Sequence, residues 1–170
     1  LGVIYDQGYG VKQDDTKAFN FYIKAAEKGY LKAIYNTGVK YYEGSGVDQN
    51  FKEAIRWFKE AAERDFTKAQ YYLGLMYQHG QGTNQDFSKS FNFYSIAADQ
   101  GMAEAQNNLA VLYKNGQGVE KDVSKFLKWI EKAAQGGNAE ALITMGSLSE
   151  KSGDKLMALV WYSIAASSGH

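Results

Sequence analysis

Apolar side chains recur along the chain with the spacing of a single helix face. Between residues 51 and 62, Ala54, Trp57, Phe58, Ala61 and Ala62 follow the i, i+3, i+4, i+7, i+8 pattern of a buried stripe, and residues 126–134 repeat it. Another helical pattern precedes each stripe, as in residues 69–78. Alternating segments rich in Val, Ile and Thr do not occur. The pattern therefore predicts pairs of α-helices, a first helix A and a second helix B, and no sheet.

Three sequence markers repeat with one period of 36 residues. Gly-x-Gly pairs begin at Gly8, Gly44, Gly80 and Gly116. Ala-Ala pairs begin at Ala25, Ala61, Ala97 and Ala133, and Ala165 follows after 32 residues. A small residue stands at Gly2, Gly38, Gly74, Ala110 and Gly146. Such a period predicts an all-α solenoid of about five helix-turn-helix units, with boundaries 1–30 (truncated), 31–66, 67–102, 103–138 and 139–170 (shortened).

Residues suited to helix ends stand between the apolar stripes. Side chains that cap a helix N-terminus precede each complete helix B, at Asp14, Asn50, Asp86 and Asp122. Glycines that favour a helix C-terminus follow it, at Gly29, Gly101 and Gly137. We interpret the Gly-x-Gly pairs as turns between helices A and B. A dinucleotide-binding loop would need a preceding strand and a third glycine, which the chain lacks there.

These motifs resemble the Sel-one-like repeat family, a relative of the tetratricopeptide repeat, over the whole chain. The family pattern A-x-x-x-L-G-x-x-Y-x-x-G-x-G-V is matched almost throughout by residues 105–119, and Asp122, Lys125 and Trp129 continue the match. Departures are found in the shortened fifth unit and at Asp65, Ser90, Ala110 and Phe126. The resemblance implies a right-handed superhelix with the A helices on its concave side. It also implies a non-catalytic scaffold or adaptor in complex assembly, as in quality control, signalling and bacterial host interaction.

Composition excludes several classes of protein. The chain has 19 basic and 19 acidic residues, so it lacks the basic excess that nucleic-acid binding requires. With no cysteine and only two histidines, it offers neither a disulfide framework nor a multi-histidine metal site. No cofactor is expected. No apolar run is long enough to span a membrane, and the compartment stays open. Because the chain begins at Leu1, we expect a fragment or a processed product.

Candidate catalytic residues are few. Ser152 and Lys155 fit the Ser-x-x-Lys spacing of penicillin-interacting serine enzymes, but neither Ser-Asp-Asn nor Lys-Thr-Gly accompanies them. We interpret Ser152 as part of a turn, and His79 as a residue at the end of a helix. The protein is therefore expected not to be an enzyme. The alternative is a regulatory domain of, or a minor activity as, a cell-wall hydrolase of the penicillin-interacting type.

Aromatic residues make up 15% of the chain and divide into two groups. One group repeats with the period and predicts core positions, at Phe21, Trp57, Phe93, Trp129 and Trp161 and at Tyr5, Tyr41, Tyr77 and Tyr113. The other group changes type from unit to unit, at Tyr35, Tyr42, Tyr71 and Tyr72. We interpret these variable tyrosines as surface residues, where they would suit a binding site. Structural packing is the alternative for Tyr35 and Tyr72.

The expected binding site is the concave face formed by the A helices. Alignment with the tetratricopeptide repeat places the second, fifth, sixth, ninth and twelfth residues of each unit there. The second unit contributes Lys32, Tyr35, Asn36, Val39 and Tyr42. The third contributes Lys68, Tyr71, Tyr72, Leu75 and Gln78, and the fourth Glu104, Asn107, Asn108, Val111 and Lys114. We expect a protein or peptide partner there, and self-association through exposed terminal repeats.

Overall fold

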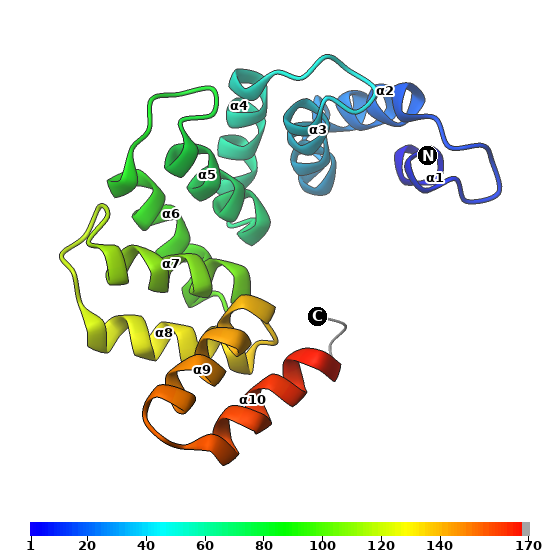
Figure 1. Ribbon diagram of the computed structural model, residues 1–170. Coiled ribbons are helices and arrows are strands. Elements are labelled where there is room, and N and C mark those ends of the chain that lie inside the picture. Colours follow the sequence, from blue (N-terminus) through cyan, green and yellow to red (C-terminus); the bar gives the residue numbers. More distant parts are fainter. Residues whose placement is uncertain (168–170) are drawn as a thin grey trace. The chain divides into compact units, whose positions relative to one another are not determined.

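The computed structural model describes residues 1–167, and these form ten α-helices and no strand (Figure 1). The helices are α1 (Gly2–Gln7), α2 (Asp15–Ala26), α3 (Leu31–Glu43), α4 (Phe51–Ala62), α5 (Thr67–His79), α6 (Phe87–Asp99), α7 (Ala103–Asn115), α8 (Val123–Gln135), α9 (Ala139–Lys151) and α10 (Lys155–Ser167). Odd-numbered helices are the predicted A helices, and even-numbered helices are the B helices. The all-α repeat prediction is confirmed.

The chain divides into two compact units, Leu1–Asp86 and Phe87–His170. In the first unit each helix from α1 to α5 packs against the next one along the chain. In the second unit helices α6 to α10 do the same. Each B helix therefore contacts the A helix that follows it within its unit, as expected for a solenoid in which neighbouring repeats share one core. No helix among residues 1–167 is both long and apolar enough to cross a membrane.

The predicted helix caps are present at three B helices. Asp14 accepts the backbone N–H of Lys17 at 2.9 Å, and Asp122 accepts that of Lys125 at 2.9 Å. Asn50 accepts two backbone N–H groups, each at 3.1 Å. These bonds satisfy amides that have no partner within the helix. The fourth expected cap, Asp86, immediately precedes α6.

The turn after helix B shows why one sequence departure is tolerated. Gly29 turns the chain after α2 with a φ of 81°. At the corresponding place after α4 stands Asp65, whose φ of 57° makes it the only non-glycine residue with a positive φ in the part of the chain described here. Aspartate enters this left-handed region more readily than most residues. The turn is therefore kept at the cost of some strain.

The second glycine of each Gly-x-Gly pair has a packing role that differs between copies. At Gly82, an added Cβ would lie 2.6 Å from the carbonyl carbon of Phe51 and 2.7 Å from its oxygen, at the start of α4. At Gly46 and Gly118 it would collide with the carbonyl groups of Asp15 and Phe87 in the same way. Gly10, with the same φ of 70° as Gly82, has no atom within 4 Å of that point. The turn interpretation is thus supported by close backbone packing at three copies.

The glycine inside α1, α3 and α9 lets an aromatic ring approach the backbone. A Cβ at Gly38 would lie 2.7 Å from the ring of Phe58, and one at Gly2 would lie 2.7 Å from the ring of Tyr22. In the fourth repeat alanine replaces this glycine at Ala110, and the residue at the position of Phe58 is Ile130. Both residues are buried. The departure at Ala110 is therefore matched by a smaller side chain on helix B.

The expected aromatic core is only partly correct. Trp57, Tyr77 and Tyr113 are buried, as predicted. The prediction is wrong for the remaining members of the two sets, which are half-buried: Tyr5, Phe21, Tyr41, Phe93, Trp129 and Trp161. The residue after the tryptophan position is the deeper one, since Phe58 and Tyr94 are each 0% exposed. Helix B therefore directs this next side chain into the core and leaves the tryptophan position at its edge.

Candidate functional site

An aromatic cluster joins helices α3, α4 and α5 on the A-helix side of the first unit. Tyr72 stacks on Phe58 with ring centroids 4.9 Å apart and planes inclined by 20°. The ring centroid of Tyr35 lies 4.8 Å from that of Phe66 and 6.0 Å from that of Tyr72. Tyr42 meets the edge of Tyr72 at 5.2 Å. The three tyrosines are half-buried and lie in ring contact, so the packing alternative applies to Tyr35 and Tyr72, which are not freely exposed surface residues.

Burial also changes the acidity of this cluster. Desolvation, followed by the interaction with Tyr72, raises the pKa of Tyr35 well above its usual value. Desolvation and the nearby charge of Glu43 raise the pKa of Tyr72. Both phenols are therefore neutral and keep their protons across the physiological pH range. A ligand on this face would meet aromatic surface with neutral hydroxyl groups, which suits the backbone and apolar side chains of a polypeptide.

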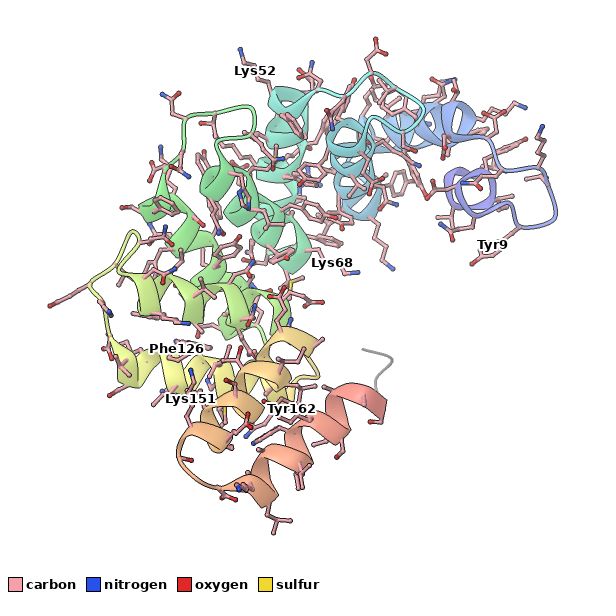
Figure 2. The ribbon with its side chains drawn as sticks, viewed as in Figure 1. Tyr9, Lys52, Lys68, Phe126, Lys151 and Tyr162 are labelled. Carbon is pink, nitrogen blue, oxygen red and sulfur yellow. The ribbon has the colours of Figure 1, made fainter. Side chains whose placement is uncertain are left out.

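The other expected site residues of the first unit surround the cluster. Lys32 and Lys68 are exposed, and Lys68 projects from the first turn of α5 in Figure 2. Half-buried positions are Asn36, Val39, Tyr71, Leu75 and Gln78. Tyr71 lies edge-on to Tyr72 with centroids 6.0 Å apart. The hydroxyl of Tyr42 donates to Oε1 of Gln81 at 3.3 Å. The predicted stripe on α3 and α5 thus forms one partly open surface with an aromatic centre.

In the second unit, one of the expected site residues is not accessible. Asn107 is 4% exposed, and its Nδ2 donates to Oε2 of Glu140 on α9 at 2.9 Å. The placement of Asn107 in an accessible binding site is therefore wrong, because Glu140 on a neighbouring A helix already accepts from its amide. Asn108 and Val111 are half-buried, while Glu104 and Lys114 are exposed. Lys114 places its Nζ 5.6 Å from the ring centre of Phe126.

One exposed residue on α9 was missed by the sequence analysis. Ile143 is 51% exposed and stands at the repeat position of Tyr35, Tyr71 and Asn107. Counting the same positions into the fifth repeat would have found it, since only the turn of that repeat is shortened.

A polar cavity of about 370 Å³ lies between α1, α2 and α3. It is lined by the charged residues Asp6, Asp15, Lys40 and Glu43, and by polar groups that include Tyr22 and Asn36. The hydroxyl of Tyr22 donates to Oδ2 of Asp6 at 3.1 Å. Two of the predicted site residues, Asn36 and Val39, line this cavity. It therefore adjoins the aromatic cluster on the same helix, α3.

Lys40 is the buried centre of this cavity. Its side chain is 7% exposed; Nζ forms an ion pair with Asp6, lies 3.1 Å from Oδ1 of Asp15, and donates to Oγ of Ser45 at 2.8 Å. Burial alone would lower its pKa, but hydrogen bonds to Asp6 and Asp15 raise the pKa of Lys40 overall. In turn, the hydrogen bond from Lys40 lowers the pKa of Asp15. Lys40 therefore remains charged.

The sequence contains a signal for this ion pair. In the other A helices the position of Lys40 is apolar, at Met76, Leu112 and Leu148. A lysine at a core position predicts a buried partner of opposite charge, because an unpaired buried ammonium group is strongly disfavoured.

The Ser-x-x-Lys segment forms the turn between α9 and α10. The hydroxyl of Ser152 donates to the backbone carbonyl of Ser149 at 2.8 Å, and Asp154 caps α10 by accepting the N–H of Met157 at 3.0 Å. Lys155 is exposed. These contacts are those of a helix end and a helix start. His79 occupies the last turn of α5 and is exposed, as expected.

Repeated helical hairpins with glycine-mediated packing define the class of this protein as an α-helical repeat scaffold. The model of the Sel1 repeat matches residues 1–30, 31–66, 67–102, 103–138 and 145–170. The chain belongs to the Sel1 repeat family. No curated protein matches the chain.

Solved structures of this family have the same fold. A Sel1 repeat protein from Oxalobacter formigenes is 34% identical, with a TM-score of 0.91 over 99% of this chain and 71% of that one. The protective antigen c5321 of uropathogenic Escherichia coli is 33% identical, with a TM-score of 0.91 over all of this chain and 37% of its own. Cysteine rich protein B of Helicobacter pylori is 26% identical, with a TM-score of 0.59 over 79% of this chain and 96% of its own. This chain spans only about a third of the antigen's length. The family and the fold together indicate a repeat scaffold, consistent with protein–protein interaction in general.

Proposed function

We propose that the protein is a non-catalytic adaptor that binds an extended segment of a partner protein. The binding surface would be the predicted stripe on α3 and α5, called here the A-helix face. The observation that carries this proposal is the half-buried cluster of Tyr35, Tyr42 and Tyr72 on α3 and α5. Tyrosine is favoured at interface hot spots because its ring buries much area at a low entropic cost while its hydroxyl stays available. Packing against Phe58 holds these rings in place before a partner arrives.

The neighbouring cavity suggests the composition of the bound segment. Its charged lining consists of three carboxylates, those of Asp6, Asp15 and Glu43, and one ammonium group, that of Lys40. Lys40 already pairs with Asp6 and Asp15, which leaves Glu43 as the exposed charge at the rim. A segment that places an apolar side chain on the tyrosines and a basic side chain near Glu43 would satisfy both regions.

In the second unit, helix α7 carries the corresponding positions with a reduced set of residues. Asn108, Val111 and Lys114 keep their proposed roles, and Ile143 on α9 is added. Asn107 instead holds α7 next to α9 through its hydrogen bond to Glu140. Self-association through a terminal repeat is compatible with this arrangement, because it would use α10 rather than the A-helix face.

The test uses peptides selected on the parent protein from a random phage-displayed library. Replacing Tyr35, Tyr71 and Leu75 together by serine should weaken the selected peptides by about 2 kcal/mol or more, a loss of roughly thirtyfold. Because Tyr35 also packs on Phe66, circular dichroism must show that helicity is kept.

A matched control removes an exposed apolar side chain from a B helix. Ile96 on α6 is 44% exposed, so Ile96→Ser should leave peptide affinity unchanged. Peptides that bind the folded triple variant as tightly as the parent, or that are lost in Ile96→Ser, would contradict a site on the A-helix face.

A further inference from the structure

The last helix, α10, has an outer face unlike that of any other B helix. Leu156 is 75% exposed, Met157 44% and Val160 42%. The same helix packs on α9 through its opposite face, where Ala158 and Ala165 are buried (Figure 1). Among residues 155–167 the only charged side chain is that of Lys155. Apolar side chains therefore line the inner face of α10 and a stripe of Leu156, Met157, Val160 and Ile164 on its outer side, next to the exposed Ser163 and Ser167. Such a pattern is typical of a helix that is covered on both sides.

The repeat provides an internal comparison for this outer face. The positions of Leu156, Met157 and Val160 are occupied in α4 by Lys52, Glu53 and Arg56, in α6 by Ser88, Lys89 and Asn92, and in α8 by Ser124, Lys125 and Lys128. Glu53 is half-buried and the other eight of these residues are exposed. Helices α4, α6 and α8 each pack against the A helix that follows them, and yet eight of these nine positions are exposed. A following A helix therefore does not cover them. Contact with a following A helix would thus not account for the apolar outer face of α10.

We propose that α10 is a dimerisation helix, which pairs with α10 of a second copy of this chain in an antiparallel arrangement. Leu156, Met157 and Val160, continued one turn later by Ile164 at 39% exposure, leave an apolar surface of a few hundred Å² open, within the range of the largest patches on monomers. Two such stripes facing each other would bury somewhat less than the roughly 1,000 Å² at which specific interfaces start. The area predicts a weak dimer.

The charges on α10 favour a second copy of this chain over a membrane surface as the binding partner. A two-fold interface is self-complementary, so it must avoid like charges, and the patch contains none. Lys155 lies in the first turn of α10, where a cation is unfavourable for the helix dipole. In an antiparallel pair it would lie beside the negative C-terminal end of the second helix. Helices that bind at membrane surfaces carry several basic residues on their polar face, whereas α10 has only Lys155.

The first experiment measures the association state by sedimentation equilibrium from about 1 to 500 μM, a range that brackets weak interfaces. We expect a monomer–dimer equilibrium for the parent. Leu156→Ser with Val160→Lys, which installs the residues that α8 has at Ser124 and Lys128, should weaken the dimer tenfold or more. Val123→Ser on α8 removes another exposed apolar side chain and should leave the equilibrium unchanged.

A second experiment does not depend on the stability of that variant. The chain has no cysteine, so a single introduced cysteine reports one contact. Val160→Cys should form an intermolecular disulfide under mild oxidation, while Lys128→Cys, at the same position of α8, should not. Equal cross-linking of the two variants, a monomer at all concentrations, or a dimer unaffected by the paired substitution would overturn the proposal. So would a monomer that binds vesicles of phosphatidylcholine and phosphatidylserine through α10, since the face would then be a membrane-binding surface.

Discussion

Replacing Gly82 by alanine should damage the fold far more than the same replacement at Gly10. Both glycines are the second member of a Gly-x-Gly turn, and both have a φ of 70°. Each variant therefore carries the same strain of an alanine in the left-handed region, about 1–2 kcal/mol. The two sites differ in their surroundings, because the new Cβ has no neighbour within 4 Å at Gly10 but lies 2.6 Å from the carbonyl carbon of Phe51 at Gly82.

The extra loss at Gly82 comes from backbone that must move. Ordinary contacts of a Cβ begin near 3.4 Å, so the start of α4 has to shift. Asn50 caps that helix with two bonds of 3.1 Å, and loss of such a cap costs about 1 kcal/mol. Overpacking of a tight site adds about 1–3 kcal/mol. We expect about 1–2 kcal/mol for Gly10→Ala and about 3–6 kcal/mol for Gly82→Ala.

Urea unfolding monitored by the fluorescence of Trp57, which is buried on α4, measures this difference near the perturbed site when Trp129 and Trp161 are replaced by phenylalanine in both variants. Hydrogen exchange of the α4 amides gives a second readout, which is needed because repeat arrays do not always unfold in one step. Equal losses in the two variants would refute the reasoning, since only the strain common to both would then matter.

Two further predictions concern the buried Ser90 and the ion pair between Lys40 and Asp15. Ser90 is fully buried and its Oγ has no hydrogen-bond partner, so Ser90→Ala, the residue found at Ala18 and Ala54, should raise the free energy of unfolding by about 1 kcal/mol, as measured in urea. The hydrogen bond from Lys40 holds the pKa of Asp15 below its ordinary value near 3.9, so its stabilising contribution is present above that pH and is lost as the pH falls through the lower, folded-state value. Thermal melts between about pH 5 and 2 should therefore show a smaller acid-induced loss for Asp15→Asn than for the parent, and equal losses would contradict this contribution.

Local rules determined most of this fold, which is why the sequence predicted it well. The period of 36 residues, the helix stripes and the caps at Asp14, Asn50 and Asp122 each depend on residues close together in the chain. Even a departure such as Asp65 keeps the local geometry, because it adopts the positive φ that the glycines have. Features set by neighbours within 20 or so residues were therefore accessible from the pattern alone.

The candidate site was harder to predict because it depends on pairs of residues on different helices. Variation between repeats was taken as a sign of exposure, yet Tyr72 varies and still stacks on Phe58 at 4.9 Å. The corresponding pairs in other repeats are Tyr22 with Asn36 and Tyr94 with Asn108, so the ring on helix B is kept while its partner on the A helix changes. Position-by-position comparison cannot distinguish a free surface residue from one that packs on a neighbouring helix in only some repeats. The buried bond between Asn107 and Glu140 escaped prediction for the same reason.

The comparison between repeats also shows where one repeat has charged residues at positions that are apolar in the others. Lys40 occupies a position that Met76 and Leu112 fill with apolar side chains, and Asp15 stands where Phe51 and Phe87 stand in later repeats. Apolar residues at such sites often give a core at least as stable as a buried ion pair. Retaining the charged pair beside a cavity of about 370 Å³ therefore needs a reason other than stability. Partner recognition is such a reason, because the cavity shares Asn36 and Val39 with the A-helix face.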